Sequence, residues 1–293
     1  MKGQVTVDMV DYIESMVEDF PYPEELEGPT VASPWSENLF KVDEKSEALS
    51  QERAEVFHTF TAKGLFACKR ARPDTSPVIA FCTTRVRKPT KEDWSKLIRY
   101  MKFLKQTAKD CLTLRADGDR VMKWHVDAAF AVHPDFRSHT GATMTLGEGA
   151  ITSICQKHKL NTRSSTEAEI VSADEAVGPM VWTGLFLDAQ GYNLKENILF
   201  QDNKSAILLE KNGRKSAGKR SKHLNIRLFF VQDQHEKGNI SIKFCPTDEM
   251  VGDFMTKPLH GKKFREFRQT IMNLPVHAQL FMACCIVLTN KDS

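Results

Sequence analysis

The sequence lacks the features of a secreted, membrane-spanning or zinc-binding protein. Its seven cysteines are scattered, with no CxxC pair, so they indicate neither a disulfide framework nor a zinc site. No apolar run of the signal-peptide type opens the chain. The longest apolar stretch, Leu280–Leu288, is shorter than the about 20 residues needed to cross a bilayer. We therefore expect a soluble protein of a reducing compartment, the cytoplasm or the nucleus, with no membrane partner.

A large excess of charge of one sign is also missing. The formal net charge of the 293 residues is +3, which by itself does not indicate a nucleic-acid partner. One segment, however, is strongly basic and contains no acid. Its glycines and serines separate seven basic residues: Lys211, Arg214, Lys215, Lys219, Arg220, Lys222 and Arg227. Such a segment can be a solvated loop or a phosphate-binding arm.

The first 115 residues contain no catalytic constellation, and they lack the paired-aspartate motif of a polymerase palm. Apolar spacing predicts helices over 8–20 and 46–70, separated by a proline-rich loop, and a further helix that begins after Thr90. A basic side of that last helix is formed by Lys96, Arg99, Lys102 and Lys105. Both a solvated helix face and a surface that follows a nucleic-acid backbone fit these residues. This half is predicted to be a mainly helical appendage.

From Arg120 onward the pattern changes to alternating strands and helices. Three strands are expected over 121–132, 142–146 and 150–156, with short turns at Gly141 and at Gly147 and Gly149. The later elements are a long helix over 165–190, a strand over 198–201, helices near 205–211 and 223–237, a strand over 240–245 and a terminal helical region. This order predicts an α/β fold with a sheet of mixed strand direction.

Acidic side chains interrupt the apolar pattern of these elements. Asp127 lies inside an apolar strand, where it is either a hydrogen-bonded structural residue or a metal ligand. Both Glu167 and Glu169 stand three residues after a hydroxyl residue and could close a capping box. Glu169 is aligned with the small residues of the helix face that packs on the sheet. We therefore assign Glu169 to the site and Glu167 to the cap.

Two further acids complete the candidate site. Asp202 ends a strand and precedes a helix, so it can be a helix N-cap or a ligand at the carboxyl end of the sheet. Asp253 follows Gly252, which would permit a close approach of backbone or substrate, although an acid there can also favour a helix N-terminus. Four clustered acids would repel one another and raise their pKa values. A pair of Mg²⁺ ions would relieve that repulsion and could support phosphodiester cleavage.

Five ordered runs carry a family resemblance: DAAFAVHPDFRSHTG, KLNTRSSTEAE, QDNKSAILLEKN, SKHLNIRLFFV and CPTDEMVGDFMTKPL. Over residues 120–273 they closely resemble the ribonuclease H domain of copia-type LTR retrotransposon Pol polyproteins. Two earlier runs, VTVDMVDYIESMVEDFP and CKRARPDTSPVIAFCTTRVRKPT, are similar to the end of the reverse transcriptase. The polymerase fingers and palm are missing. The chain is therefore expected to be a C-terminal piece of a polyprotein, with the rest of that polyprotein as a partner.

The resemblance implies a domain division and an activity. Residues 1–115 would be a thumb- or connection-like reverse-transcriptase remnant, 120–260 a ribonuclease H-like domain with a mixed five-stranded sheet flanked by helices, and 261–293 a C-terminal helix and tail. The enzyme would cleave the RNA strand of RNA–DNA hybrids during reverse transcription, in the cytoplasm (within a virus-like particle) or in the nucleus. Two Mg²⁺ ions, with Mn²⁺ as a substitute, would serve as cofactors.

The resemblance also assigns roles to individual residues. The catalytic metal ligands fall on Asp127, Glu169, Asp202 and Asp253. Contacts with the nucleic acid are expected from Ser165, Thr166, Asn203, Arg214, Lys215, Lys219, Arg220, Lys222 and His223. Two positions depart from the family pattern. Ala129 replaces a residue that is usually polar, and no histidine precedes Asp253 where cellular ribonucleases H have one near the site.

A function of another class fits the same sequence. The chain could be a catalytically idle retroelement remnant that only binds nucleic acid. Retention of all four acids argues against this reading, and the missing polymerase palm argues for it. A binding-only module would bind a hybrid in a salt-dependent way and never cleave it.

Overall fold

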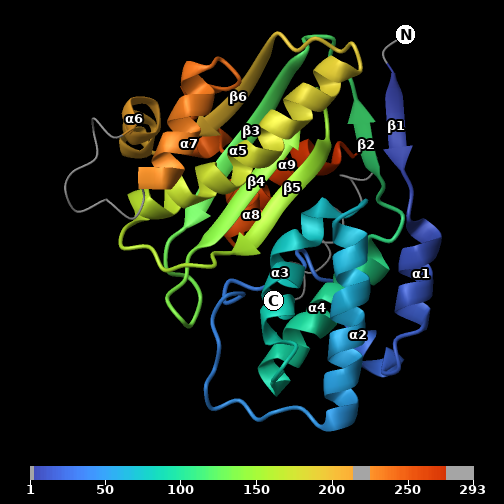
Figure 1. Cartoon of the computed structure of the whole chain (residues 1–293). Helices are drawn as coiled ribbons and strands as arrows, with labels where there is room; N and C mark the ends of the chain where they lie inside the picture. The colour runs from blue at the N-terminus through green and yellow to red at the C-terminus, as the bar shows by residue number, and fades with distance from the viewer. Residues whose placement is uncertain (1–2, 214–224, 275–293) are drawn as a thin grey trace. The chain divides into compact units, whose positions relative to one another are not determined.

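A mixed five-stranded sheet forms the centre of the second half of the chain (Figure 1). Its strand order is β5-β4-β3-β6-β7, in which β3 pairs antiparallel with β4 and parallel with β6. The strands are β3 (Val121–Ala129), β4 (His139–Thr145), β5 (Ala150–Lys157), β6 (Glu196–Gln201) and β7 (Ser241–Phe244). The predicted α/β class with a five-stranded sheet of mixed direction is therefore confirmed.

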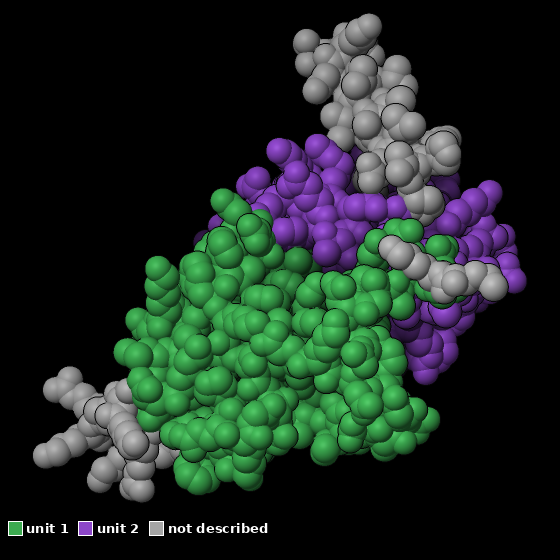
Figure 2. Space-filling model, turned by 90° about the horizontal axis from the view of Figure 1, so that it is seen from above, with its two compact units in different colours: residues 1–4, 115–257 green, residues 5–114, 258–293 purple. Residues whose placement is uncertain are grey.

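Residues 3–213 and 225–274 are described by this computed structural model. The chain divides into two compact units, coloured separately in Figure 2. Unit 1 comprises Met1–Gln4 and Arg115–Lys257, and unit 2 comprises Val5–Leu114 and Pro258–Ser293. The second segment of unit 2 includes helix α9, within the range 261–293 that was expected to stand apart as a C-terminal helix and tail. The assignment of the first half to a reverse-transcriptase remnant stays a prediction.

Helices cover both faces of the sheet in unit 1. The hydroxyl of Thr140 in β4 lies 3.0 Å from the hydroxyl of Ser172 in α5, whereas a Cβ on the next residue, Gly141, would meet Thr256 of α8. Because successive strand residues point to opposite faces, α5 and α8 lie on opposite sides of β4. The helices of this unit are α5 (Ser165–Ala189), α6 (Lys204–Asn212), α7 (Asn225–Glu236) and α8 (Asp253–Thr256), with a short 3-10 turn η5 (Thr247–Glu249) before α8.

The core of unit 1 is formed between α5 and the sheet. Apolar residues that alternate along β3 pack on the small side chains of α5, which let the helix approach closely. The fully buried members include Met122, Trp124, Val126, Ala173, Ala176, Val177, Met180 and Leu199. This packing holds the middle of α5 against β3, the strand that carries Asp127.

Unit 2 is mainly helical, as its apolar spacing predicted. Its helices are α1 (Val10–Glu18), α2 (Gln51–Cys68), α3 (Ser76–Arg85), α4 (Lys91–Gln106) and α9 (Gly261–Met272), with 3-10 turns η1 (Pro23–Leu26) and η2 (Pro73–Thr75). Strands β1 (Gln4–Val7) and β2 (Leu112–Arg115) pair in a two-stranded sheet. Among the described helices of the whole chain, none has the length and apolar character needed to span a membrane.

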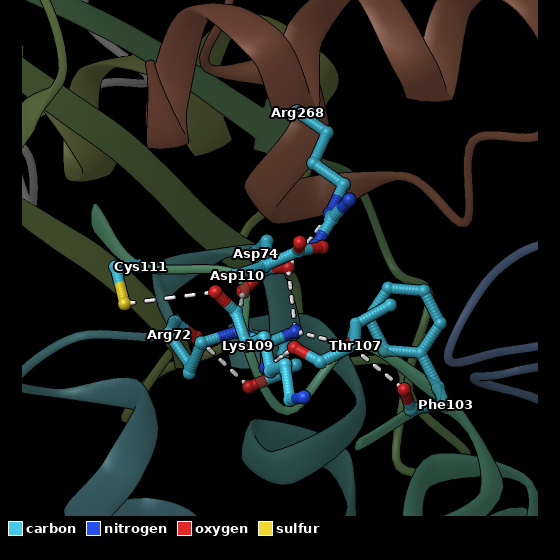
Figure 3. Close-up of polar contacts among 9 residues, drawn as sticks. Arg72, Asp74, Phe103, Thr107, Lys109, Asp110, Cys111 and Arg268 are labelled. Carbon is cyan, nitrogen blue, oxygen red and sulfur yellow. Dashed lines mark hydrogen bonds and ion pairs between the residues drawn. The ribbon is translucent and has the colours of Figure 1, made fainter. Parts of the chain in front are cut away.

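An ion-pair network is buried in unit 2 (Figure 3). The guanidinium of Arg72 donates two hydrogen bonds to Asp74, at 2.9 and 3.0 Å, and two more to Thr107. Arg268 of α9 donates to Asp74 at 2.8 Å and to Asp110 at 2.7 Å. Asp74 is fully buried, yet its pKa is lowered, because Arg72 and Arg268 outweigh the effect of burial. Two arginines and two aspartates thus balance one another inside this unit.

Two expectations from the sequence are wrong in detail. Gly141 does not form a turn: it lies within β4, opposite Asp127. In unit 2, two members of the basic side of α4 do not form an open surface. Lys96 is buried and bonds the Lys41 carbonyl, and Arg99 donates to the carbonyls of Ser33 and Trp35. Those two side chains hold the loop before α2, so they do not support a nucleic-acid surface on α4.

Candidate metal centre

Asp127 is presented by the central strand of unit 1. It is 2 % exposed, and the Thr256 hydroxyl of α8 donates a hydrogen bond to its carboxylate. An ionised carboxylate at such a buried position needs compensation from donors or cations. The single hydroxyl donor makes Asp127 partly structural, but it leaves the remaining acceptor capacity of the carboxylate for another partner.

Two glycines bring Asp253 to Asp127. A Cβ on Gly252 would lie 3.1 Å from the backbone nitrogen of Asp127, and a Cβ on Gly141 would lie 2.5 Å from Cγ2 of Thr256. The backbone before α8 therefore rests directly on β3 and β4, which no larger residue would allow. The close approach that Gly252 suggested in the sequence is an approach of backbone to backbone. It places the first residue of α8, Asp253, beside the strand acid.

Three of the four predicted acids converge. Asp127, Asp202 and Asp253 each offer one carboxylate oxygen, and these atoms all lie within 4.8 Å of one another. Asp202 stands at the carboxyl end of β6 and accepts a hydrogen bond from the Thr247 hydroxyl at 3.0 Å. Asp202 is not the N-cap of α6, because the side chain of Asn203 caps that helix. The alternative role for Asp202 that the sequence left open is therefore excluded.

Glu169 lies beside this group but is not one of the three. It is 5 % exposed, and Gln201 donates a hydrogen bond to its carboxylate at 3.3 Å. Its pKa is raised well above the usual range by burial and by the charges of Asp127 and Asp202. Glu167, by contrast, sits at the helix start, where its backbone N–H bonds the Ser164 side chain and its carboxylate accepts from the N–H of Arg163. The contacts of Glu167 match the predicted cap role, whereas the assignment of Glu169 to the site stays a prediction.

A lysine that sequence reasoning missed belongs to the same cluster. The ammonium of Lys257 lies 2.7 Å from Oδ1 of Asp253 and 3.7 Å from Oδ2 of Asp127. Burial alone would lower the pKa of Lys257, but Asp127 and Asp253 outweigh it and raise that pKa. The signal was present in the sequence, because Lys257 follows Asp253 by four residues, a spacing at which helical side chains meet.

The carboxylates still exceed the available positive charge. The pKa of Asp253 is raised to about 6, first by burial and then by the charge of Asp127, in spite of its bond to Lys257. A further acid, Glu210 of α6, is fully buried, and its carboxylate has no hydrogen-bond partner among the described residues. Burial raises the pKa of Glu210 to about 8. Three converging carboxylates with uncompensated charge are the donor set that suits a hard divalent cation such as Mg²⁺ or Mn²⁺.

The residues expected to contact nucleic acid are placed only in part. Ser165 and Thr166 form the first turn of α5, where Ser165 is exposed and Thr166 is partly exposed. The side-chain oxygen of Asn203 is occupied by the N–H groups of Ser205 and Ala206. The remaining predicted contacts lie outside the described residues: Arg214, Lys215, Lys219, Arg220, Lys222 and His223.

Comparison with known proteins identifies relatives of one kind. The chain is 29 % identical over 208 residues to a retrovirus-related Pol polyprotein from transposon TNT 1-94 of Nicotiana tabacum, covering 71 % of this chain and 15 % of the relative. Pol polyproteins from transposons RE2 and RE1 of Arabidopsis thaliana are 27 % and 28 % identical, and in each case the match covers 68 % of this chain and 14 % of the relative. No family model matches the chain.

Homologues of this chain therefore include retrovirus-related Pol polyproteins from plant transposons, as the sequence motifs predicted. The copia-type ribonuclease H domain fits this kinship. The chain spans about one seventh of the length of these relatives. Among solved structures, an RNase H1 named LC11, isolated from compost by a metagenomic approach, matches with a TM-score of 0.36 and 12 % identity, covering 46 % of this chain and 92 % of that one.

Proposed function

We propose that unit 1 is a metal-dependent endonuclease that hydrolyses the RNA strand of RNA–DNA hybrids as part of a retrotransposon Pol polyprotein. The observation that carries the proposal is the convergence of Asp127, Asp202 and Asp253, whose oxygens lie within 4.8 Å of one another in a largely buried setting. Kinship with retrovirus-related Pol polyproteins supports a nuclease-type function in a retrotransposon.

The chain's own residues define how the centre would act. Asp127, Asp202 and Asp253 would hold Mg²⁺ or Mn²⁺, and the buried Glu169 would complete a pair of sites from the α5 side. Bound divalent ions supply charge stabilisation for the attacking and leaving oxygens in phosphodiester hydrolysis. Thr256 and Thr247 orient two of the aspartates through their hydroxyl groups. The expected products carry 5′-phosphate and 3′-hydroxyl ends.

The nucleic acid would be held by the start of α5 and by the basic segment of the sequence. Exposed Ser165 and partly exposed Thr166 lie in the first turn of α5, one turn before the buried Glu169. Backbone N–H groups of a first helical turn favour a phosphate. The basic residues from Arg214 to Lys222, with His223, would add sequence-independent attraction to the backbone.

Substitution of one aspartate tests the proposal. Asp127→Asn is expected to lower the rate of hybrid cleavage by about 100-fold or more, because one ligand contributes several kcal/mol to charge stabilisation in the transition state. Asp233→Asn is the control and should cleave at the wild-type rate, because Asp233 on α7 forms a solvent-facing pair with Lys237. Cleavage of an end-labelled RNA–DNA hybrid with Mg²⁺ or Mn²⁺ measures both.

The competing function is a module that binds hybrids without cleaving them. It is distinguished by measuring hybrid binding by fluorescence anisotropy beside the cleavage rate. A wild-type chain that binds in a salt-dependent way and leaves the hybrid intact would overturn the proposed activity. So would an Asp127→Asn chain that cleaves as fast as the wild type.

A further inference from the structure

Lys257 differs from the other lysines paired with acids, because its ammonium lies between two of the converging carboxylates. We propose that Lys257 is a built-in cation of the carboxylate centre, which competes with the divalent ion for Asp253 and Asp127. This inference rests on the proposed function, since it takes these aspartates to be ligands of a divalent ion. The lysine would then set the concentration of divalent ion at which the centre fills.

The distances place the ammonium on the oxygens that a metal ion would need. Nζ of Lys257 lies 2.7 Å from Oδ1 of Asp253 and 3.7 Å from Oδ2 of Asp127. The side chains of these two acids are 7 % and 3 % exposed. Water therefore screens the attraction only weakly, and a single positive charge offsets part of the repulsion between the acids. A divalent ion can bind the same oxygens only by displacing this charge.

An ordinary ion pair of the same geometry is present in unit 1 for comparison. Asp233 on α7 and Lys237, just after that helix, are also four residues apart, and their Nζ–Oδ2 distance is also 2.7 Å. Their side chains are 60 % and 30 % exposed. Such a solvent-exposed ion pair contributes little to the stability of the fold. The two pairs share the i,i+4 spacing and the distance; they differ in the burial of the paired carboxylate and in the second buried carboxylate, Asp127, beside Lys257.

The backbone fixes the origin of the Lys257 side chain, while its end can leave. Thr256, one residue earlier, donates its hydroxyl to Asp127, and the N–H of Lys257 donates to the Asp253 carbonyl at 2.9 Å. The Lys257 side chain is nevertheless 40 % exposed, so it has a route to solvent. A lysine stem is flexible and its ammonium is a compact charge. The ammonium can therefore swing away when a divalent ion binds, without any movement of α8.

Metal binding by single variants of the full chain tests the inference. Mn²⁺ is titrated into wild type, Lys257→Gln, Lys257→Arg and Lys237→Gln by calorimetry, and thermal unfolding is followed with and without Mn²⁺. Lys257→Gln is expected to bind Mn²⁺ about 10-fold more tightly, because the competing charge is gone. Its metal-free Tm should fall and its Mn²⁺-induced rise in Tm should exceed that of the wild type. Lys257→Arg keeps the charge and should remain near the wild type.

The control and the contradicting results separate this inference from the proposed function. Lys237→Gln should leave both the Mn²⁺ affinity and the Tm response unchanged. Wild-type affinity in Lys257→Gln, or tighter binding in Lys257→Arg as well, would overturn the role of Lys257 alone. A wild-type chain that binds no Mn²⁺ would overturn this inference together with the proposed metal centre. Tighter Mn²⁺ binding by Lys257→Gln in a chain that never cleaves hybrids would support the inference and count against the activity.

Discussion

Each unit of this chain buries a cluster of acids, but the two clusters have opposite charge balance. In unit 2, Asp74 is fully buried and receives hydrogen bonds from Arg72 and Arg268. In unit 1, three aspartates converge. Among the described residues, Lys257 is the cation that forms ion pairs with two of them. The pKa of Asp74 is lowered, whereas the pKa of Asp253 is raised to about 6.

The comparison shows that burial of a carboxylate does not by itself mark a functional site. A buried acid whose charge is matched by arginines is costly to leave unpaired, and its satisfied oxygens are not available to a ligand. A group of acids that keeps an uncompensated charge is costly for the fold, and this cost is removed when a cation binds.

The largest expected effect comes from breaking the balanced cluster. Asp74→Asn leaves Arg72 and Arg268 without their shared carboxylate, so it should lower the free energy of unfolding of unit 2 by about 3–5 kcal/mol. Asp19→Asn is a matched control, since Asp19 pairs with Lys63 at 2.9 Å on the surface, and it should cost less than about 1 kcal/mol. Urea unfolding measures both. Equal effects of the two substitutions would remove the distinction between buried and exposed pairing.

The second largest effect is expected from Gly141→Ala, because close packing of α8 on β4 holds Asp253 near Asp127. The added methyl would lie 2.5 Å from Cγ2 of Thr256 and 2.8 Å from the carbonyl oxygen of Gly252, so it should disturb this packing. We expect a loss of about 1–3 kcal/mol in unfolding free energy, with weaker Mn²⁺ binding as Asp253 moves. Gly178→Ala on α5 meets nothing within 4 Å and should be neutral or up to about 1 kcal/mol stabilising. A Gly141→Ala chain as stable as Gly178→Ala would contradict this account.

The smallest expected effect is a gain, and not a loss, in unfolding free energy. In metal-free buffer at pH 7.5, Asp253→Asn should stabilise unit 1 by about 1–2 kcal/mol, although it also loses the bond to Lys257. The folded chain holds the Asp253 proton more tightly than the unfolded chain does, since its pKa rises from 3.8 to about 6. The stability that the protonated Asp253 contributes is therefore fully present below about pH 4 and is lost as the pH rises to about 6.

The pH dependence gives the sharpest contrast between the clusters. The lowered pKa of Asp74 means that its contribution is present above the unfolded value of 3.8 and is lost as the pH falls. Urea unfolding in EDTA at several pH values, for wild type and for both Asp→Asn variants, measures the two trends. An Asp253→Asn chain that is destabilised at pH 7.5 as strongly as Asp74→Asn would show that the two clusters are alike.

Local features of the fold could be predicted from the sequence. The periodic apolar residues placed α4, α5 and the strands of unit 1 near their observed positions, and Thr90 is the cap of α4, as predicted. Helix α3 was missed, because its mostly buried residues carry no polar face to reveal a period. Gly141 was assigned to a turn because its role, the close approach of α8, depends on a segment more than a hundred residues later.

The acids of the candidate site could be predicted from the sequence, but the lysine that partly neutralises their charge could not. The strand position of Asp127 and the helix stripe that includes Glu169 are local patterns, and both acids are buried as those patterns predict. Lys257 was overlooked because a lysine four residues from an acid is common on solvated helices. Its second partner, Asp127, comes from a distant strand. Long-range pairing of this kind leaves no periodic signal in a single sequence.

The partners of the buried network in unit 2 are far apart along the chain. Asp74 and Arg268 are separated by 194 residues, and all of the sheet of unit 1 is encoded between them. At about 5–20 residues per second, a ribosome needs roughly 10 to 40 s to reach Arg268 after Asp74. During synthesis the sheet can therefore form before Arg268, the second arginine that pairs with Asp74, has been added to the chain. Proteolysis or premature termination just after Lys257 would leave the acids of the candidate centre in place. It would also remove Arg268 from the buried ion-pair network of unit 2.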